Sequence, residues 1–395
     1  MSAAPPAAVL AIDGGNSKTD VALVAADGTL LATVRGGPSN HQGIGSERAT
    51  KELTSLVASA AALAGLPTVG PVAQHTSACL AGADLPVEEA DLNRLVQSLG
   101  WSITSTVVND TFAVLRAGLA DAGPHWGIGV VCGAGINCVG VAPDGRTTRF
   151  LSLGELSGDW GGGGALGPLA LWWAIRAEDG RGPETELRTA VPAHFGLDRV
   201  EDVVVGMHLG IIDYSEQHGL VPLLFAVAGQ GDQVARDIVL RQATEICLMV
   251  TVAARRLDLL ATRGVPVVLG GSLMTARDPL LSQAISDQLA TSLPGAEIRV
   301  VDVPPVAGAA LLGLDHVGAA PAAAAHLRES ARMTWQLRGS RRDGEPAWSR
   351  AAGQAAVDEL AGQVDRQEPA PAEPPDQVLL RRQHRGPQRR THQRD

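Results

Sequence analysis

Three turns of small residues follow apolar, strand-like runs in this sequence. They cover residues 13–19 (Asp-Gly-Gly-Asn-Ser-Lys-Thr), 133–137 (Gly-Ala-Gly-Ile-Asn) and 270–272 (Gly-Gly-Ser). Glycine lets backbone N–H groups approach a phosphate, and a carboxylate beside such a turn can hold Mg²⁺ through water. The first two turns therefore indicate phosphate clamps, and the third could let an adenine lie flat against the backbone. Each turn by itself is also typical of an ordinary connection between two elements.

The candidate nucleotide-binding residues all lie in these turns, and Asp13 is also the candidate Mg²⁺ ligand. Lys18 lacks the preceding glycine of a Walker A loop, and a strand is expected after it instead of a helix. The second turn lacks the later glycines of the dinucleotide pattern. The candidates are Asp13, Gly14, Gly15, Asn16, Ser17, Lys18, Thr19, Gly133, Ala134, Gly135, Ile136, Asn137, Gly270, Gly271 and Ser272.

Asp110 is the candidate reactive carboxylate. It follows the apolar run 103–108 and precedes helical sequence from Thr111, so it is expected at the end of a strand, facing a cleft. A carboxylate there can orient an acceptor hydroxyl and receive its proton during phosphoryl transfer. Aspartate is also a favoured residue for capping a helix N-terminus. Position alone leaves both roles open.

Composition and charge exclude several classes of protein. A chain of 395 residues that is 45% hydrophobic and 19% charged predicts two or more domains with sizeable cores. Its formal net charge of −10 disfavours a nucleic-acid partner. No apolar run reaches the roughly 18 residues of a membrane-spanning helix, and residues 1–9 carry no basic side chain. We therefore expect a soluble cytoplasmic protein.

Two segments of the chain follow the same plan. Residues 9–35 and 127–152 each read as a strand, a glycine turn, a strand, an Asp-Gly turn and a third strand. Helical sequence follows each block, over residues 46–64 and 165–177. A further helical stretch is expected over 234–261. The alternation predicts an α/β protein with two similar units and a ligand cleft between them.

The ordered set of motifs resembles the superfamily of sugar kinases, heat-shock chaperones and actin. Within it, the chain is most similar to the branch that joins N-acetylglucosamine kinases with the ATPase subunits and activators of benzoyl-CoA reductase and hydroxyacyl-CoA dehydratases. The resemblance covers about residues 9–314. It rests on the three turns above and on two connecting segments, 108–110 and 305–310.

This resemblance implies the fold and the cofactors. We expect two ribonuclease H-like domains, each with a five-stranded mixed sheet flanked by helices, which close over ATP and Mg²⁺. The first domain would span 1–118, completed by about 303–317, and the second would span 119–302. The segment 318–395, rich in Ala, Pro, Arg and Gln, is expected to be a disordered tail. Members of the family commonly form homodimers.

Two further segments resemble those of amino-sugar kinases. Residues 37–41 are similar to a loop whose asparagine bonds sugar hydroxyls, and residues 154–164 are similar to a glycine-rich acidic loop beside the sugar and the nucleotide. The chain departs from the family at Trp160 and in the extra glycines 162–164. The resemblance therefore does not define which residues would form the pocket for the 2-substituent of the sugar. The candidate sugar-binding residues are Asn40, His41, Asn109, Glu155 and Asp159.

The sequence therefore predicts an ATP-dependent kinase that phosphorylates the 6-hydroxyl of N-acetylglucosamine or of a related hexosamine such as glucosamine. The alternative is an ATPase subunit or activator that drives electron transfer to a partner reductase or dehydratase. That role needs thiolates presented to an iron–sulfur cluster. Cys132 lies in a proposed phosphate turn and Cys138 in an apolar run, so neither is expected to be free for this purpose.

Overall fold

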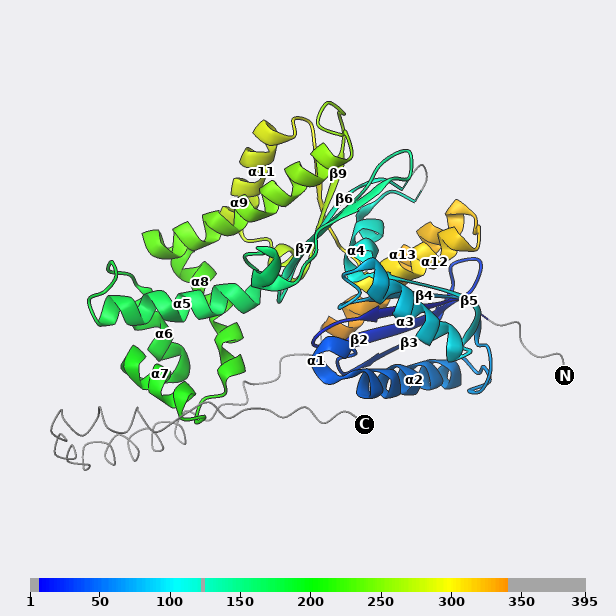
Figure 1. The fold of residues 1–395 in the computed structure, drawn as a ribbon, viewed down its shortest axis with the longest axis horizontal. Coiled ribbons are helices and arrows are strands. Elements are labelled where there is room, and N and C mark those ends of the chain that lie inside the picture. The colour runs from blue at the N-terminus through cyan, green and yellow to red at the C-terminus, as the bar shows by residue number, and fades with distance from the viewer. Residues whose placement is uncertain (1–6, 122–124, 340–395) are drawn as a thin grey trace, which may run out of the picture.

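The computed structural model describes residues 7–121 and 125–339, which form two lobes (Figure 1). Each lobe is built on a five-stranded sheet. The strand order is β3-β2-β1-β4-β5 in the first lobe and β10-β9-β6-β7-β8 in the second. Both sheets are mixed and flanked by helices, which confirms the fold predicted from the sequence.

The two sheets have the same connectivity. In each, the first three strands form an antiparallel meander, and two later strands add parallel to the first strand. The two units predicted from residues 9–35 and 127–152 are these meanders. The strands are β1 (Ala7–Gly14), β2 (Thr19–Val24), β3 (Leu30–Gly36), β4 (Ala73–Leu80) and β5 (Ser102–Asn109), then β6 (Gly127–Cys132), β7 (Ile136–Val141), β8 (Thr147–Arg149), β9 (Pro266–Gly270) and β10 (Glu297–Val300).

Strand β1 is buried on both faces because helices cover the first sheet from both sides. Leu10 and Ile12 pack in the core that includes α2 (Ser46–Leu63), while Val9 and Ala11 pack in the core that includes α12 (Pro305–His316). The alternation follows from the two-residue period of a strand. Helix α12 thus lies on the first sheet although it follows the second sheet in the chain. This lobe also contains α1 (His41–Ile44) and α3 (Pro86–Ser98).

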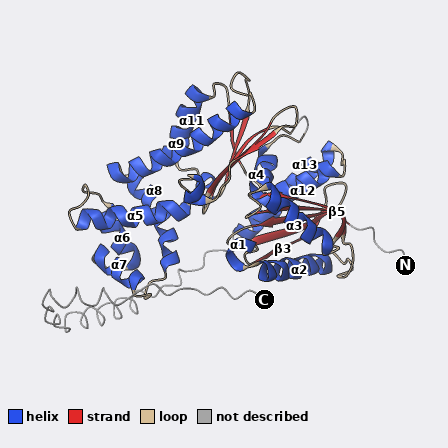
Figure 2. Ribbon diagram, in the orientation of Figure 1, coloured by secondary structure: helices blue, strands red, loops and turns tan. Residues whose placement is uncertain are grey.

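The second lobe carries a group of helices beside its sheet. Figure 2 shows α5 to α8 extending away from the strands of this lobe. None of the helices within residues 7–121 and 125–339 is both long and apolar enough to cross a membrane. The elements are the 3₁₀ helices η1 (Gly154–Ser157) and η2 (Tyr214–Gly219), and the helices α5 (Gly163–Glu178), α6 (Leu187–Phe195), α7 (Val200–His208), α8 (Leu220–Gly229), α9 (Gln233–Arg256), α10 (Ser272–Thr275) and α11 (Pro279–Ser292).

Helix α4 (Asp110–Gly118) packs against both lobes at very short range. On one side, a Cβ added at Gly129 of the second sheet would lie 2.7 Å from the Cβ of Leu115. On the other side, a Cβ added at Gly308 of α12 would lie 1.9 Å from the carbonyl oxygen of Ala113. Only glycine fits at these two contacts. The helix that begins with Asp110 is therefore fixed between α12 and the second sheet.

Helix α13 (Pro321–Gly339) differs from the disordered tail expected from residue 318 onward. Its Ala323, Ala324 and Leu327 are buried in the core that includes α12 and β1. The alanine-rich composition that indicated a tail serves here to bring the helix close to its neighbours. A Cβ at Gly28 would lie 2.0 Å from the Ala323 carbonyl oxygen. Residues 340–395, which hold the rest of the expected tail, lie outside the described residues.

The contact at Gly308 gives a stability prediction. Gly308→Ala is expected to lower the free energy of unfolding by about 1–3 kcal/mol, because the added methyl group collides with backbone that cannot move independently. Gly229→Ala, in α8, is the matched control: no atom lies within 4 Å of its added Cβ. The control should be neutral or stabilising. Urea unfolding measures both, and equal stability of the two variants would contradict the tight α4–α12 contact.

Candidate functional site

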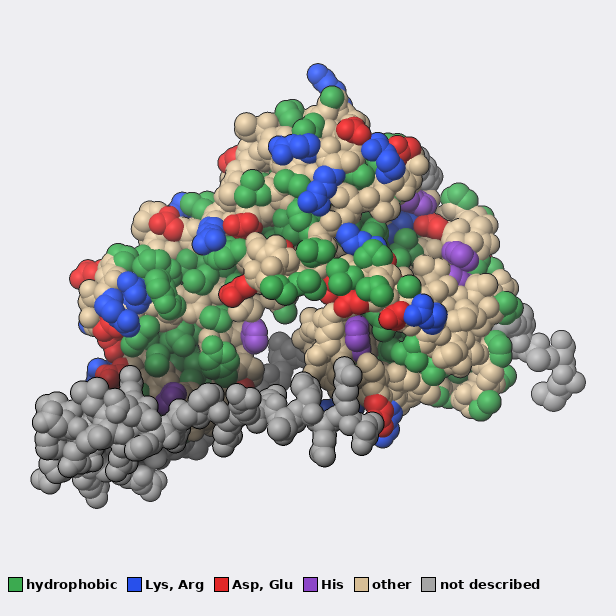
Figure 3. Space-filling view, in the orientation of Figure 1, with side chains coloured by type: hydrophobic (Ala, Val, Ile, Leu, Met, Phe, Trp, Pro, Cys, Tyr) green, Lys and Arg blue, Asp and Glu red, His purple; other side chains and the backbone are tan. Residues whose placement is uncertain are grey.

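A cleft of about 340 Å³ lies where the two lobes face each other. Figure 3 shows the hollow between the lobes. Both glycine-rich phosphate turns predicted from the sequence border this cleft. Its lining is Asp13, Gly15, Asn16, Ser17, Lys18, Asn40, Gln42, Ala81, Gly82, Asp84, Asn109, Asp110, Val114, Val131, Gly133, Ala134, Gly135, Ile136, Asn137, Ser152, Gly271 and Pro305.

A second, larger cavity of about 1030 Å³ adjoins the cleft. The two share four lining residues, Asn16, Ser17, Gly133 and Ala134, so they meet at the glycine turns. The rest of the larger cavity is mainly apolar and comes from the second lobe. Among these residues the sequence had marked Ser272 and, within the glycine-rich loop 154–164, Gly163. The full set is Gly163, His218, Val221, Pro222, Phe225, Ser272, Leu273, Ala276, Arg277, Asp278 and Pro279.

The first turn is closed by backbone hydrogen bonds. The N–H of Gly15 donates to the carbonyl of Lys18 at 2.9 Å, and the N–H of Ser39 donates to the carbonyl of Gly15 at 3.2 Å. Thr19 donates its hydroxyl to that of Ser39 at 2.7 Å. Gly14 and Thr19 therefore hold the turn in place without lining the cleft, whereas the residues between them do line it.

The second turn leaves open space where a ligand could lie. A Cβ at Gly135 would meet no atom within 4 Å. The turn is supported by the N–H groups of Gly163 and Gly164, which donate to the carbonyls of Gly133 and Ala134 at 2.7 and 2.8 Å. Gly162 has φ +77°, and a Cβ there would lie 2.6 Å from the Ala134 carbonyl oxygen. The extra glycines of this chain thus hold the second turn.

The third turn approaches the second one closely. Gly271 lines the cleft with φ +90°, and a Cβ there would lie 2.3 Å from the carbonyl oxygen of Cys132. Gly270 does not line either cavity, since it packs against Val114 of α4. Ser272 begins α10 and lines the larger cavity. The predicted adenosine motif therefore lies at the boundary between the two cavities.

Asp13 is a half-buried carboxylate at the end of β1, and it faces the cleft. Burial raises its pKa to about 8, and the negative charges of Asp110 and Asp20 act in the same direction. Lys18 and Arg35 oppose this rise. A carboxylate that is costly to ionise alone gains most from a cation placed beside it. This electrostatic state fits the predicted role of Asp13 in holding Mg²⁺.

Asp110 is the first residue of α4, and the capping role belongs to its neighbour. Asn109 is the N-cap: its side-chain oxygen accepts the N–H of Thr111 at 3.0 Å. Burial raises the pKa of Asp110 to about 6, against the effect of hydrogen bonding at Thr111. Its carboxylate lines the cleft together with Asp13. Of the two roles left open by the sequence, the geometry is consistent with the chemical one.

Asn109 lines the cleft and joins the two lobes there. Its side-chain N–H donates to Asp84 at 2.9 Å, and its oxygen also accepts from Asn137 of the second lobe at 3.0 Å. The Asn109 N–H donates to Glu89 at 3.2 Å, and Glu89 pairs with Arg149 of β8 at 2.6 Å. Asn109, predicted as a sugar ligand, is only 2% exposed and is largely committed to this bridge.

Asp84 and Ser152 line the cleft although the sequence reasoning did not select them. Asp84 follows β4, which is parallel to β1 and β5, so the rule that ligands bind beyond the carboxyl ends of parallel strands could have found it. Burial raises its pKa to about 6, helped by Glu88 and Asp110. Ser152 has φ 53°, and its buried hydroxyl has no hydrogen-bond partner among the described residues. No sequence signal marks Ser152.

The other predicted sugar-binding residues differ in position. Asn40 lines the cleft, donates to Asn16 at 2.5 Å and caps α1 through the N–H of Gln42. His41 lies next to it but does not line the cleft. Glu155 is exposed in η1, and Asp159 accepts the hydroxyl of Ser157 at 2.6 Å. Neither acid lines either cavity.

Comparison with protein families places this chain in a known group. Residues 10–313 match the model of the BadF/BadG/BcrA/BcrD ATPase family. The chain belongs to this family. The match confirms the family resemblance predicted from the order of the motifs, and it ends before α13.

Two named relatives are sugar kinases. A protein of Clostridium acetobutylicum named N-acetylmuramic acid/N-acetylglucosamine kinase is 30% identical over 266 residues, which is 67% of this chain and 84% of the relative. A protein of Dictyostelium discoideum named N-acetyl-D-glucosamine kinase is 27% identical over 322 residues, which is 78% of this chain and 97% of the relative. These are N-acetylglucosamine kinases of the type that the sequence resembles.

A solved structure supports the same group. The crystal structure of a putative N-acetylglucosamine kinase from Chromobacterium violaceum superposes with a TM-score of 0.58 at 26% identity. The alignment covers 78% of this chain and 98% of that protein. The two-lobe fold is therefore shared over almost the whole length of this relative.

The raised pKa of Asp13 predicts a stability effect. A carboxyl group whose pKa is higher in the folded than in the unfolded state lowers the free energy of unfolding once it ionises. For Asp13 this loss is absent below about pH 4, grows between pH 4 and 8, and is complete above pH 8. Asp13→Asn should therefore unfold with a free energy higher by on the order of 1–3 kcal/mol at pH 8.5, and equal to wild type at pH 4. Urea unfolding without nucleotide or Mg²⁺ measures this. A variant less stable than wild type at pH 8.5 would contradict it.

Proposed function

We propose that this protein is an ATP-dependent kinase that transfers a phosphoryl group to the 6-hydroxyl of N-acetylglucosamine or of a closely related hexosamine such as glucosamine. The observation that carries the proposal is the junction of the two cavities. The smaller one carries the acidic side chains, the larger one is mainly apolar, and the two glycine turns border both. In this arrangement the smaller cavity would hold the sugar, the turns the triphosphate, and the larger cavity the adenine.

The triphosphate would lie between the two turns, with the side chain of Lys18 beside it. The N–H groups of Gly15 and Gly133 donate to the carbonyls of Lys18 and Gly135 within their own turns, so they hold the shape of the phosphate site. No group of three or more His, Cys, Asp or Glu side chains within the described ranges could hold a metal by itself. A Mg²⁺ ion would therefore take most of its ligands from phosphate and water, as it commonly does, with Asp13 as the protein carboxylate. Bound ATP and Mg²⁺ supply the phosphoryl group and neutralise its charge.

Asp110 would accept the hydrogen bond of the attacking hydroxyl and take its proton on a carboxylate oxygen. Within residues 7–121 and 125–339 the buried hydroxyl of Ser152 has no hydrogen-bond partner, and the side-chain amide of Asn40 carries a second N–H besides the one it donates to Asn16. Both would serve sugar hydroxyls. A buried polar group that gains a partner only when the sugar binds contributes to selectivity. The 6-hydroxyl is the one primary alcohol of a hexosamine, and it is the least hindered acceptor. Glu155 and Asp159 remain candidates on the family resemblance alone.

The charge of the cleft favours a neutral or cationic sugar. Three acidic side chains, those of Asp13, Asp84 and Asp110, line it against one cationic side chain, Lys18. Asp84 and Asp110, with pKa values of about 6, are ionised at neutral pH. A sugar that carries its own carboxylate, such as N-acetylmuramic acid, would bring a further negative charge into this space. At separations below about 8 Å and limited solvent access, each such repulsion is on the order of 1–2 kcal/mol. We therefore favour N-acetylglucosamine over N-acetylmuramic acid as the substrate.

The alternative role in electron transfer finds no support in the cysteines. All four cysteines of the chain, Cys79, Cys132, Cys138 and Cys247, are buried. Burial raises the pKa of Cys132 to about 12 and places that of Cys79 well above its usual range. A cluster shared between subunits needs exposed thiolates. None of these thiols meets that requirement.

Asp110→Asn tests the assignment of the base. We expect kcat for N-acetylglucosamine to fall by at least about 100-fold, because the amide cannot take the proton. ATP binding, measured by calorimetry, should stay within threefold of wild type. For the wild type, kcat/KM should decline as pH falls below about 6, where the Asp110 carboxylate becomes protonated. Undiminished sugar phosphorylation by the variant would remove Asp110 from this role.

Asp84→Asn tests the charge argument. Wild type should phosphorylate N-acetylglucosamine with a higher kcat/KM than N-acetylmuramic acid. The variant should raise the ratio of N-acetylmuramic acid to N-acetylglucosamine turnover by about five- to tenfold, since one repulsive charge is gone. Asp91→Asn, an exposed acid on α3, is the control and should leave the ratio unchanged. A preference for N-acetylmuramic acid in the wild type would refute the argument.

A further inference from the structure

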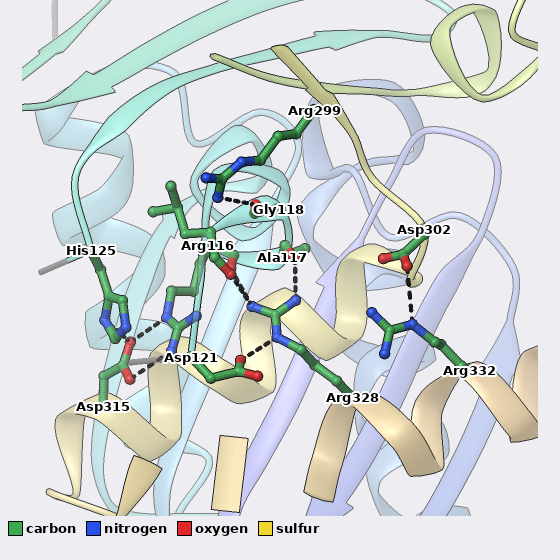
Figure 4. Close-up of polar contacts among 11 residues, drawn as sticks. Arg116, Ala117, Gly118, Asp121, His125, Arg299, Asp302, Asp315, Arg328 and Arg332 are labelled. Carbon is green, nitrogen blue, oxygen red and sulfur yellow. Dashed lines mark hydrogen bonds and ion pairs between the residues drawn. The ribbon is translucent and has the colours of Figure 1, made fainter. Parts of the chain in front are cut away.

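Helix α13 lies outside the family match, yet it contacts the hinge between the lobes. Figure 4 shows two of its arginines, Arg328 and Arg332, pointing toward the segments where the chain passes from one lobe to the other. These two crossovers follow α4 and β10. Neither the sequence motifs nor the proposed chemistry assigns a role to this contact.

Arg328 binds the C-terminal end of α4. Its side chain is 7% exposed and donates to the carbonyls of Arg116 and Leu119 at 3.1 and 2.7 Å and to that of Ala117. It also forms an ion pair with Asp121. The last carbonyls of a helix have no partner within the helix, and a cation there is favourable to the helix dipole. Arg328 therefore caps α4 from a distance of more than 200 residues in the chain.

The second crossover is tied to the same helix. Arg332, one turn after Arg328, pairs with Asp302 at 3.0 Å. Arg299 at the end of the second sheet donates to the Gly118 carbonyl at 3.4 Å, which joins the two crossovers to each other. Asp302 and Arg332 are more exposed than Arg328 and its partners. The buried arginine is thus the stronger of the two attachments.

Within α4 itself, a second buried arginine fixes the helix laterally. Arg116, whose side chain is 2% exposed, pairs with Asp315 of α12 at 2.7 Å, and His125 of the first crossover lies 3.1 Å from the same carboxylate. The helix is nine residues long, with Asp110 at its start and the carbonyls bound by Arg328 at its end. The contacts of Arg328 at the end of this short helix thus add to the glycine contacts at its sides in fixing the helix that begins with Asp110.

We propose that Arg328 is a positioning residue for the phosphoryl transfer: by capping α4 and holding the first crossover, it sets the place of Asp110 in the cleft. This proposal goes beyond the proposed function, and it rests on that function for the assignment of Asp110 as the reacting group. Removal of the guanidinium takes the side-chain donor away from the carbonyls of Ala117 and Leu119 and breaks the ion pair that holds Asp121 of the crossover. A displacement of a catalytic group by about 1 Å can lower the rate by about 100-fold.

Arg328→Met is the direct test, because Met keeps much of the apolar stem. We expect kcat to fall by about 10- to 100-fold, while the KM values for ATP and the sugar change by less than threefold. The variant should still bind one ATP per chain. Amide hydrogen exchange of residues 114–118 should accelerate by about tenfold or more. Arg328→Lys keeps the positive charge but lacks the planar guanidinium, so its kcat should lie between those of Arg328→Met and wild type.

Two controls separate positioning from stability. Glu329→Gln, at the exposed neighbouring position on α13, should keep wild-type kcat. Leu289→Ala removes a buried side chain from the core of the second lobe and should lower the melting temperature without changing kcat per bound ATP. If Arg328→Met lowers kcat per bound ATP no more than Leu289→Ala does, Arg328 has only a structural role and the proposal fails.

Asp121→Asn decides the matter if Arg328→Met does not fold. It weakens the charged contact and leaves the carbonyl contacts, so a smaller loss of kcat, about three- to tenfold, is expected. Unchanged kcat and unchanged exchange of α4 in this variant would overturn the proposal. Wild-type protein inactive on every sugar would refute the proposed function instead, and the exchange of residues 114–118 would still test the capping of α4 by Arg328.

Discussion

Helix α4 is held on two sides by contacts that admit no side chain larger than that of glycine. Gly308 presses on it from α12 and Gly129 from the second sheet. Such contacts make the helix a fixed reference between the lobes, and Asp110 lies at its start. The placement of the carboxylate therefore depends on backbone packing, which is stiff, and much less on its own side-chain partners.

The three acidic side chains of the cleft are costly to ionise when no ligand is bound. Asp13, Asp84 and Asp110 each have a raised pKa, and burial is the first cause in every case. Proteins keep such costly groups where a ligand relieves them, and a cation or a hydroxyl donor would do so here. The stability that this arrangement costs is offset by the hydrophobic cores on the two faces of the first sheet and by the large core of the second lobe. The same acidic lining favours sugars without a negative charge.

The sequence predicted those features that depend on neighbouring residues. The Gly-rich and Asp-Gly turns at 13–19, 27–28 and 133–137 determine both meanders locally, and the order of motifs identified the family. Ser152 and Arg328 were missed because their roles depend on contacts across the fold, whereas Asp84 was missed although it follows a strand parallel to β1 and β5. Arg328 lies in an alanine-rich segment whose composition indicated a tail, and only its distant partners on α4 reveal its position. The glycines 162–164 were noticed, but their support of the second turn is likewise a long-range contact.

The central claim is that Asp110 faces the acceptor hydroxyl of a sugar, with the triphosphate held between the two glycine turns. A crystal structure with N-acetylglucosamine and a non-hydrolysable ATP analogue measures this directly. The account predicts an Asp110 carboxylate oxygen about 2.6–3.2 Å from the sugar 6-oxygen, with the phosphates between Gly15 and Gly133. A sugar bound away from Asp110, or a nucleotide that contacts only one of the two turns, would contradict it.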